Sequence, residues 1–364
     1  MKKVLFVATV TPHIEGFHAP FLKEFKNRGW ETHVATGDSL ELDKSYCDKK
    51  HEIAIKRSPY SFDNLRAIRE LRKIIEKEKF DIIHCHTPMG GIIARLAAKK
   101  AHKNGTRIIY TAHGFHFFKG APLLNWLIYY PIERTMARLT DIIITINQED
   151  YRRAKKQFKT RVEYVPGIGV DPKKFNIKMS EKRRNMLRKE LGLKPDDFVM
   201  IYLAEISNRK NQRWLIGALE GLIRDNQSIH LLLAGKDSLG GTIQKRVEEI
   251  GLDRQIHFLG YRKDVPELLK ISDLYVSSSS QEGLPVNIME AMFMGLPIVA
   301  VDCRGVSDLI KDEVSARSIR KSDSKGFLKA VEGFLNSPKK PHRYNIERYK
   351  ISDVLRQMME IYGV

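Results

Sequence analysis

Two carboxylates eight positions apart, Glu282 and Glu290, stand on either side of a Gly-Leu-Pro turn in the segment QEGLPVNIME. Apolar runs before this segment and at Pro297–Val301 predict strand, loop, helix and strand in that order. Pro285 fits the first helical position, and a helix N-terminus offers free N–H groups and a positive dipole end to a phosphate. Glu282 in the loop, and Glu290 about one and a half turns into the helix, could accept hydrogen bonds from sugar hydroxyls. The segment is therefore typical of a nucleotide-sugar pocket.

Other polar residues also follow predicted strands. In open α/β sheets, ligands bind beyond the carboxyl ends of the strands. The residues in such places are Thr11-Pro12-His13, His84 and His86, His113-Gly114, Asn147, Glu205 to Lys210, and Gly235-Lys236. Two sheets whose carboxyl edges face each other would bring these groups together.

The elements that position these residues alternate between strand and helix along the whole chain. Most strand candidates are continuous apolar runs, as expected for strands buried on both faces of a parallel sheet. The strands predicted in the first half are Val4–Thr9, His33–Thr36, Ile82–His86, Ile108–Thr111, Ile142–Ile146 and Val162–Val165. Those in the second half are Val199–Ala204, His230–Ala234, Ile256–Leu259, Leu274–Val276 and Ile298–Val301.

Segments such as Asn64–Glu78 show helical spacing of apolar residues between the strands. The βαβ pattern occurs twice, and a polar stretch, Val170–Lys194, separates the two halves. At 364 residues the chain is also long for one domain. We therefore expect one Rossmann-like domain at residues 1–172 and a second at 173–343.

The net charge of +19 points to an anionic partner or to a basic surface that aids solubility. Residues 1–172 hold 30 Lys and Arg against 19 Asp and Glu, an excess of eleven positive charges. Acidic substrates and an anionic membrane surface fit this charge. No nucleic-acid-binding motif is present in the sequence, so we expect no nucleic-acid partner.

No apolar run approaches the ~18–20 residues that span a bilayer. The start MKKVLFVATVTPH has two lysines and a short apolar run, and we interpret it as a first strand rather than a signal peptide. Cys47, Cys85 and Cys303 are scattered and form neither a disulfide framework nor a zinc pattern. These features favour a reducing, cytoplasmic location.

Three segments resemble the family-4 retaining glycosyltransferases with the GT-B fold, in particular those of bacterial exopolysaccharide and capsule synthesis. They are the start MKKVLFVATVTPHIEGFHAPFLKEFKNRGWETHVATG, the segment YTAHGFHFFKG, and Glu282-x7-Glu290 followed by GLPIVAVDCRGVSDLI. The resemblance extends along nearly the whole chain. It implies an α/β fold of two Rossmann-like domains whose parallel sheets face each other across a cleft, with a last helix, residues 344–362, that packs back on the first domain.

The same resemblance implies which residues of the second domain bind the donor phosphates. Lys210 in AEISNRKNQ matches the family's phosphate-binding lysine, where a point charge suffices. The family usually has an arginine where Glu205 stands here, and Arg209 is the candidate replacement. The departure makes the phosphate contact of this motif less secure. The other interpretation of Arg209 and Lys210 is a charged helix start.

Further donor contacts are implied for both carboxylates. Glu282 would bind the hydroxyls of the transferred sugar and act in catalysis, and Glu290 would bind the ribose. Backbone N–H groups near Gly283 and Leu284 would stabilise the diphosphate, where charge develops in the transition state.

Two loops remain in the implied donor site. Tyr261 and Arg262 follow a predicted strand where relatives hold the base, and a ring or a cation could stack on uracil. A surface turn is the alternative interpretation. Gly167 belongs to the loop Gly167-Ile168-Gly169, which would border the donor or serve as a plain hinge.

In the first domain the resemblance places His113 beside the transferred sugar as a catalytic residue. A structural histidine that caps a strand is the alternative. His13, Gly16 and His18, from the segment HIEGFH, are expected on the acceptor side. The aromatic stretch Phe115–Tyr130 suits either a membrane interface or core packing.

His84 and His86 are two positions apart on a predicted strand, so both point to one face, as metal ligands could. No third ligand stands near them in the sequence, and the family that the chain resembles uses no metal in catalysis. We therefore expect no metal site and no cofactor, and a structural or supporting role for this pair.

The resemblance implies a retaining glycosyltransferase that moves a sugar from a nucleotide-diphosphate sugar, most simply a UDP-sugar, to a hydroxyl of a lipid-linked saccharide. Its expected setting is exopolysaccharide or capsule synthesis at the inner face of the plasma membrane, to which it would bind peripherally. No covalent nucleophile stands out, which fits a mechanism in which the leaving phosphate accepts the acceptor's proton. A GT-B nucleotide-sugar epimerase and a non-catalytic basic membrane-binding protein are the alternatives.

Overall fold

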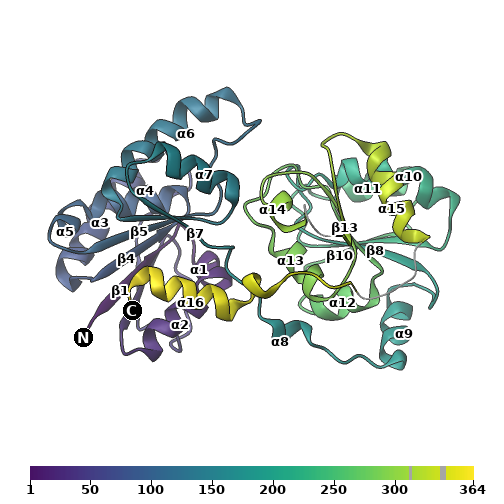
Figure 1. Ribbon diagram of the computed structural model, residues 1–364, viewed down its shortest axis with the longest axis horizontal. Helices are drawn as coiled ribbons and strands as arrows, with labels where there is room; N and C mark the ends of the chain where they lie inside the picture. Colours follow the sequence, from purple (N-terminus) through teal and green to yellow (C-terminus); the bar gives the residue numbers. More distant parts are fainter. Residues whose placement is uncertain (311–313, 337–341) are drawn as a thin grey trace. The chain divides into compact units, whose positions relative to one another are not determined.

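The computed structural model describes residues 1–310, 314–336 and 342–364, which form two compact units (Figure 1). The first unit contains Met1–Ile168 and, from the end of the chain, Ser352–Val364. The second contains Gly169–Ile351. Each unit is built on a parallel sheet flanked by helices, so the predicted α/β class with two Rossmann-like halves is confirmed.

The sheet of the first unit has seven strands in the order β3-β2-β1-β4-β5-β6-β7 among the described residues, and every neighbouring pair is parallel. Its strands are β1 (Lys3–Val7), β2 (Glu31–Thr36), β3 (Lys49–Glu52), β4 (Ile82–His86), β5 (Arg107–Ala112), β6 (Ile142–Thr145) and β7 (Arg161–Tyr164). Because β1 lies next to both β2 and β4, the strand order reverses there, which is the usual place for a ligand in such sheets.

Helices cover both faces of this sheet. They are α1 (Thr11–Phe17), α2 (Ala19–Asn27), α3 (Asp63–Glu78), α4 (Pro88–Ala97), α5 (Lys99–Lys103), α6 (Leu123–Met136), the 3-10 turn η1 (Ala137–Leu139), α7 (Gln148–Gln157) and the C-terminal α16 (Ile351–Tyr362). Leu5 and Val7 of β1 pack in the core with α3 and α4, whereas Val4 and Phe6 pack in the core with α2 and α16. The strand is therefore apolar at every one of these positions because both of its faces are buried.

The C-terminal helix is shorter than predicted. It begins at Ile351, not at Tyr344, after a 3-10 turn, η2 (Glu347–Tyr349). The Tyr344 hydroxyl donates to the carbonyls of Leu296 and Ser315 in the second unit (2.7 and 3.0 Å), and these bonds hold the chain in a non-helical path there. In the first unit, Arg107 donates to the last two carbonyls of α16, which satisfies groups that a helix end leaves unpaired.

The second unit has a six-stranded parallel sheet in the order β10-β9-β8-β11-β12-β13, within the described part of the chain. Its strands are β8 (Phe198–Leu203), β9 (Ile229–Ala234), β10 (Ile256–Gly260), β11 (Leu274–Ser277), β12 (Ile298–Val301) and β13 (Ala316–Ile319). Its helices are α8 (Pro172–Phe175), α9 (Glu181–Glu190), α10 (Gln212–Asp225), α11 (Thr242–Glu249), α12 (Val265–Ile271), α13 (Val286–Phe293), α14 (Val306–Ile310) and α15 (Ser324–Leu335).

The eleven strands predicted from apolar runs are all present, with ends that differ by at most two residues. The sequence analysis missed β3 (KKHE) and β13 (ARSI). Both are edge strands with polar or charged residues at half of their positions or more. Edge strands carry charge because charge discourages pairing with other chains, so they lack the apolar run that identifies a central strand.

Candidate active site

The serine run Ser277–Ser280 leaves β11 and holds the backbone of the loop that carries Lys210. Ser278 Oγ donates to the Lys210 carbonyl oxygen at 2.8 Å. Ser279 Oγ lies 2.6 Å from the hydroxyl of Tyr202 on β8, and that hydroxyl donates in turn to the Lys210 carbonyl at 3.1 Å. Ser278 directly, and Ser279 through Tyr202, thus satisfy the buried Lys210 carbonyl, and the run positions the lysine.

Lys210 and Glu282 form an ion pair in which both side chains are largely buried. Arg209 lies farther away, with Nη1 3.4 Å from Glu282 Oε2, and half of its side chain is exposed. A buried ion pair depends on both members, because loss of one leaves an uncompensated charge. The fold therefore brings together the lysine predicted to bind phosphate and the carboxylate predicted to bind sugar.

The turn between Glu282 and α13 depends on a second glycine. Gly305 has a φ of +80°, and a Cβ at this position would lie 2.1 Å from the carbonyl oxygen of Gly283, so only glycine fits. Pro285 takes the N-cap position rather than the predicted first helical position, because its backbone is extended (ψ 111°). Leu284 is buried beside it. Pro285 itself makes no side-chain cap. The N–H of Ile288 donates to Asn287 Oδ1 at 3.0 Å, so the N–H groups of α13 that can serve an anion are those before Ile288.

Glu290 is the fifth residue of α13 and is half-buried. Desolvation raises the pKa of its carboxyl group to about 7, and the charge of Lys174 on α8 offsets part of this effect. No described group donates a hydrogen bond to this carboxylate. A desolvated carboxylate without a donor is a ready acceptor for ligand hydroxyls, and shifted pKa values of this kind gather at functional sites.

The two side chains predicted to hold the base, Tyr261 and Arg262, differ in whether they are already engaged with another residue. Tyr261, which follows β10, is 66% exposed, with Lys236 Nζ 5.6 Å from the centre of its ring. Arg262 is engaged with Asp264, and its Nε lies 2.8 Å from Oδ1. Tyr261 can therefore stack on a ligand as it stands, whereas Arg262 would first have to leave its carboxylate. Glu205, which stands in place of the family's arginine, accepts a hydrogen bond from the loop after β9.

Gly167 and Gly169 both have the left-handed backbone that favours glycine, with φ values of +78° and +76°. A Cβ at Gly169 would lie 2.6 Å from the Cα of Ile351, so this position also requires glycine for close packing. The two glycines are therefore needed by the backbone itself, whatever ligand the loop borders.

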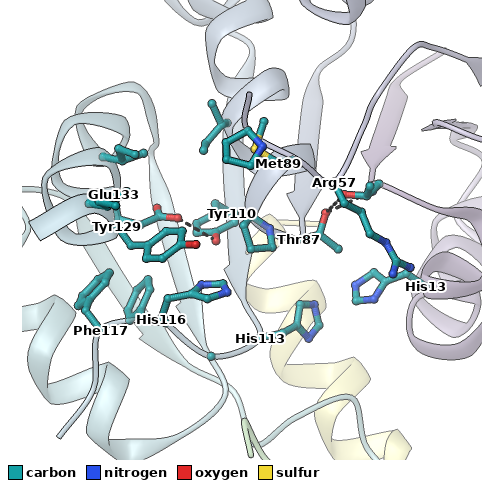
Figure 2. Close-up of a pocket in the computed structure, with 18 of the residues that line it drawn as sticks. His13, Arg57, Thr87, Met89, Tyr110, His113, His116, Phe117, Tyr129 and Glu133 are labelled. Atoms are coloured by element: carbon teal, nitrogen blue, oxygen red, sulfur yellow. Dashed lines mark hydrogen bonds between the residues drawn. The ribbon is translucent and has the colours of Figure 1, made fainter. Parts of the chain in front are cut away.

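In the first unit His113 follows β5 and lies among three other histidines. The ring centres of His113 and His13 on α1 are 4.7 Å apart, and Figure 2 shows these two side by side. The rings of His18 and His86 stack with centres 3.6 Å apart. Burial lowers the pKa of all four imidazoles, that of His13 to about 4, so they are neutral at pH 7. In sequence no third histidine stands near the pair at 84 and 86, but the fold brings three to His86.

His84 has a different environment from His86. Its Nδ1 lies 2.6 Å from the hydroxyl of Tyr362 on α16, and its Nε2 lies 2.8 Å from Thr111 Oγ1. Both of its ring nitrogens are therefore paired, and it joins the C-terminal helix to the sheet. Of the residues predicted on the acceptor side, His18 is buried, whereas Gly16 is exposed, and a Cβ at Gly16 would meet no described atom within 4 Å.

A pocket of about 550 Å³ opens beside His13 and His113 in the first unit (Figure 2). Tyr110 and Glu133 contribute polar groups, and the Tyr110 hydroxyl donates to Glu133 Oε1 at 3.2 Å. Arg95 donates to Glu133 Oε2, and its guanidinium carbon lies 4.0 Å from the centre of the Tyr110 ring. Most other lining residues are apolar or aromatic: Val10, Pro59, Tyr60, Pro88, Met89, Ile92, Phe115, Phe117, Ile128, Tyr129 and Ile132.

Sequence reasoning missed the Arg95–Glu133 pair, because the two residues stand 38 positions apart on different helices and look like ordinary surface charges. The position of Glu133 within the apolar stretch of α6 is the sequence feature that could have indicated a buried and paired carboxylate. The aromatic stretch itself divides: Phe115 and Phe117 are buried in the core, whereas Leu123, Leu124 and Leu127 are exposed. Core packing therefore accounts for the first part of the stretch and leaves the leucines of α6 unexplained.

Among the helices that the structure describes, none combines the length and the apolar character that crossing a bilayer requires. The exposed leucines of α6 are instead an apolar feature of the surface on a helix that lines the pocket.

Two family models match the sequence. Residues 3–147 match the model described as "Glycosyl transferase 4-like", and residues 183–351 match "Glycosyl transferases group 1". Together they cover most of both units.

Curated relatives span much of the same length. The chain is 40% identical to EpsD of Bacillus subtilis, which is described as a putative glycosyltransferase, over 100% of this chain and 96% of EpsD. It is 28% identical to the UDP-Gal:alpha-D-GlcNAc-diphosphoundecaprenol alpha-1,3-galactosyltransferase of Escherichia coli, over 74% of this chain and 70% of that enzyme.

Among solved structures, HepE of Anabaena in complex with UDP and glucose superposes with a TM-score of 0.81 and covers 100% of both chains at 19% identity. At that identity the likeness establishes the fold.

Proposed function

Because this chain belongs to the family-4-like glycosyltransferases with the GT-B fold, we propose that it moves a sugar from a UDP-sugar to a hydroxyl of a lipid-linked saccharide, with retention at the anomeric carbon. The proposed setting is exopolysaccharide or capsule synthesis. The E. coli relative named for a UDP-galactose donor and a diphosphoundecaprenol acceptor supports both the donor and the acceptor class.

The observation that carries the proposal is the buried Lys210–Glu282 pair at the turn before α13. A diphosphate that enters here offers Lys210 a more highly charged partner than Glu282. Charge-assisted contacts to phosphate are strong, so the lysine would turn to the diphosphate and the carboxylate of Glu282 would become free to accept sugar hydroxyls. Binding of the diphosphate would thus free Lys210 from Glu282, so that the lysine contacts phosphate and the carboxylate contacts the sugar.

The rest of the donor has matching groups in the second unit. The N–H groups near Gly283 and Leu284 would face the phosphates, and Arg209 would add a second cation at the rim. The carboxylate of Glu290 would accept the ribose hydroxyls, and the exposed ring of Tyr261 would stack on the base. Arg262 and Gly167 would border the nucleotide.

On the acceptor side, we assign the pocket beside His13 and His113 to the acceptor. Its apolar lining suits the first part of a lipid chain, and its carboxylate Glu133 suits a hydroxyl. Arg57 also lines this pocket and would pair with an acceptor phosphate. Gly16 and His18 would support the same side, and His113 would position the transferred sugar.

In the proposed reaction the bond between the anomeric carbon and the diphosphate oxygen breaks, and the acceptor oxygen bonds to the same face of that carbon. The proton of the acceptor hydroxyl goes to the departing phosphate oxygen. The negative charge that develops on the diphosphate is stabilised by Lys210 and the amides of the α13 turn. No metal ion takes part in this scheme, so a chelator should leave transfer intact.

Thermal stabilisation by nucleotides tests the donor class. A ligand that binds only the native protein stabilises it by an amount that grows with the logarithm of its concentration over Kd, and so raises the melting temperature. We expect UDP and UDP-sugars at millimolar concentration to stabilise the full chain by several degrees, and ADP and GDP to do less. Equal stabilisation by all three nucleotides would refute the preference for uracil.

A further inference from the structure

Four histidines of the first unit form a cluster: His13 on α1, His18 between α1 and α2, His86 at the end of β4 and His113 after β5. One ring nitrogen from each lies within 4.8 Å of the others. The one hydrogen-bond contact within the cluster, among the described residues, joins His13 Nε2 and His18 Nε2, 3.4 Å apart. Residues far apart in sequence thus place their ring nitrogens around one point.

Half of the eight ring nitrogens in the cluster are buried without a hydrogen-bond partner among the described atoms. His18 Nδ1, His86 Nδ1, His86 Nε2 and His113 Nε2 are shielded from solvent and lack a hydrogen-bond partner among the described atoms. A buried polar atom without a partner is unfavourable, and natural proteins contain few of them. Four such atoms on three rings indicate that a bound species supplies part of the missing contacts, since one ion takes a single nitrogen from each ring.

His84 provides an internal comparison, since it lies on the same strand and the same face as His86. Both of its nitrogens are paired, with Tyr362 and Thr111. Burial on β4 therefore does not by itself leave an imidazole without partners. Mutual hydrogen bonds do not satisfy the cluster either, because among its four described rings only His13 and His18 are within hydrogen-bond distance of each other.

The type of ligand atom in the cluster indicates which species it would bind. All four groups are neutral imidazoles with a nitrogen lone pair to offer. The rings of His18 and His86 stack with centres 3.6 Å apart, so these two rings have to turn apart before both can bind one ion. Several imidazoles around one point suit the borderline transition metals, zinc above all. Two ligands on a tetrahedral ion with zinc–nitrogen bonds of ~2.0–2.1 Å lie about 3.4 Å apart, which is the separation of His13 Nε2 and His18 Nε2.

We propose that His13, His18, His86 and His113 bind one transition-metal ion, with Zn²⁺ as the first candidate. His13 and His113 line the 550 Å³ pocket, so the ion has a path from solvent. The other candidate cluster, Glu31, His33 and Glu78, differs in that its carboxylates already hold Lys3 and Lys49.

The ion has a consequence for transfer that rests on the function proposed above. His13 and His113 cannot contact substrate through the nitrogens that bind a metal. Zinc at this point therefore inhibits the enzyme, although the proposed reaction itself needs no metal. The site makes the transferase sensitive to free zinc.

Metal binding is tested first, without reference to activity. Full-length protein stripped with chelator is titrated with Co²⁺, and visible absorption follows its coordination; Zn²⁺ is then added as a competitor. We expect one Co²⁺ per chain and its displacement by Zn²⁺. His86→Gln should weaken Co²⁺ binding at least 100-fold, and His13→Asn at least tenfold. His51→Asn, which alters a half-buried histidine outside the cluster, should bind like the parent.

Absence of a cobalt spectrum and of stoichiometric zinc in the parent protein would overturn the proposal. Unchanged binding in both folded cluster variants would do the same, with folding checked by circular dichroism. The second arm measures transfer: Zn²⁺ should inhibit the parent, and the remaining activity of His86→Gln should be at least tenfold less sensitive. If the parent binds metal but transfers no sugar, the metal site stands and the proposed function fails.

Discussion

The Lys210 ammonium group is paired with the Glu282 carboxylate, whereas the sequence predicts phosphate binding by Lys210 and sugar binding by Glu282 as separate roles. Both side chains are buried. The motifs identify each residue in the sequence. They do not predict the contact, since 72 positions separate the two residues and the contact depends on the way β8 and β11 pair.

Lys210→Ala should lower the affinity for UDP at least tenfold, because a charge-assisted phosphate contact is lost. It should also lower the free energy of unfolding by about 3 kcal/mol, because Glu282 stays buried without a partner. Calorimetric titration and denaturant unfolding measure the two effects. The double variant Lys210→Met/Glu282→Gln should regain most of the stability but not the affinity. Lys245→Ala, which alters an exposed lysine on α11, should change neither. Parental UDP affinity in folded Lys210→Ala would show that the lysine does not contact phosphate.

The raised pKa of Glu290 predicts how the stability of the protein depends on pH. Its pKa is raised from an ordinary value of 4.5 to about 7 in the folded protein. Between those values the native state binds more protons than the unfolded state, so the free energy of unfolding falls as the pH rises, and the full penalty is present above about pH 7. Glu290→Gln should therefore stabilise the free protein by roughly 1–3 kcal/mol at pH 8, and by little at about pH 4.5.

The measurement for Glu290 is the melting temperature of both proteins from about pH 4.5 to pH 8. A difference that is constant across this range would contradict a desolvated carboxyl group. The same variant should bind UDP more weakly at pH 8, since an amide accepts ribose hydroxyls less well than a carboxylate.

At the scale of elements, the sequence predicts the parts of the fold that follow from burial alone. The central strands β8 and β12 are buried at every position and appear in the sequence as continuous apolar runs. By contrast, the turn before α13 depends on Gly305, far along the chain from Gly283. The histidine cluster depends on α1 lying at the ends of β4 and β5. Such contacts follow from strand order, and no local pattern records strand order.

Gly305→Ala should displace the Gly283 turn and so raise the KM for the donor several-fold, since a Cβ would lie 2.1 Å from the Gly283 carbonyl oxygen. The destabilisation should reach about 2 kcal/mol or more, combining a left-handed backbone with a clash. Gly240→Ala is a matched control: its φ is +62° and a Cβ there meets no described atom within 4 Å. It should cost about 1 kcal/mol and leave KM unchanged. Equal effects of both variants on KM would show that the turn does not shape the donor site.

At the scale of the whole molecule, two features of the first unit point to an anionic membrane. The excess of eleven positive charges lies in residues 1–172, and the exposed residues Leu124 and Leu127 lie on α6, which contributes to the pocket assigned to the acceptor. Basic residues near an anionic surface contribute about 1 kcal/mol each within a Debye length, and inserted apolar side chains add to this. A lipid-linked acceptor would be reached at that surface.

Vesicles that contain anionic lipid should therefore co-sediment with the protein at low salt and release it at high salt. Leu124→Ser/Leu127→Ser should weaken binding several-fold at all salt concentrations, whereas Leu40→Ser, which alters an exposed leucine elsewhere, should not. Charge reversal at Arg66, Arg69 and Lys73 should weaken binding at low salt. If the protein bound neutral and anionic vesicles equally well, the excess of positive charge in the first unit would contribute to solubility only.

The central claim is that this chain transfers a sugar from a UDP-sugar to a lipid-linked saccharide, and product analysis tests it most directly. Full-length protein is incubated with radiolabelled UDP-sugars and a lipid-linked saccharide, with chelator present. We predict that label moves into the lipid fraction with one UDP released per sugar. The new linkage should keep the anomeric configuration of the donor. Glu282→Ala and His113→Ala should abolish the transfer while both variants remain folded. Label that stays on the nucleotide as an isomerised sugar, with no UDP released, would contradict the claim and identify an epimerase.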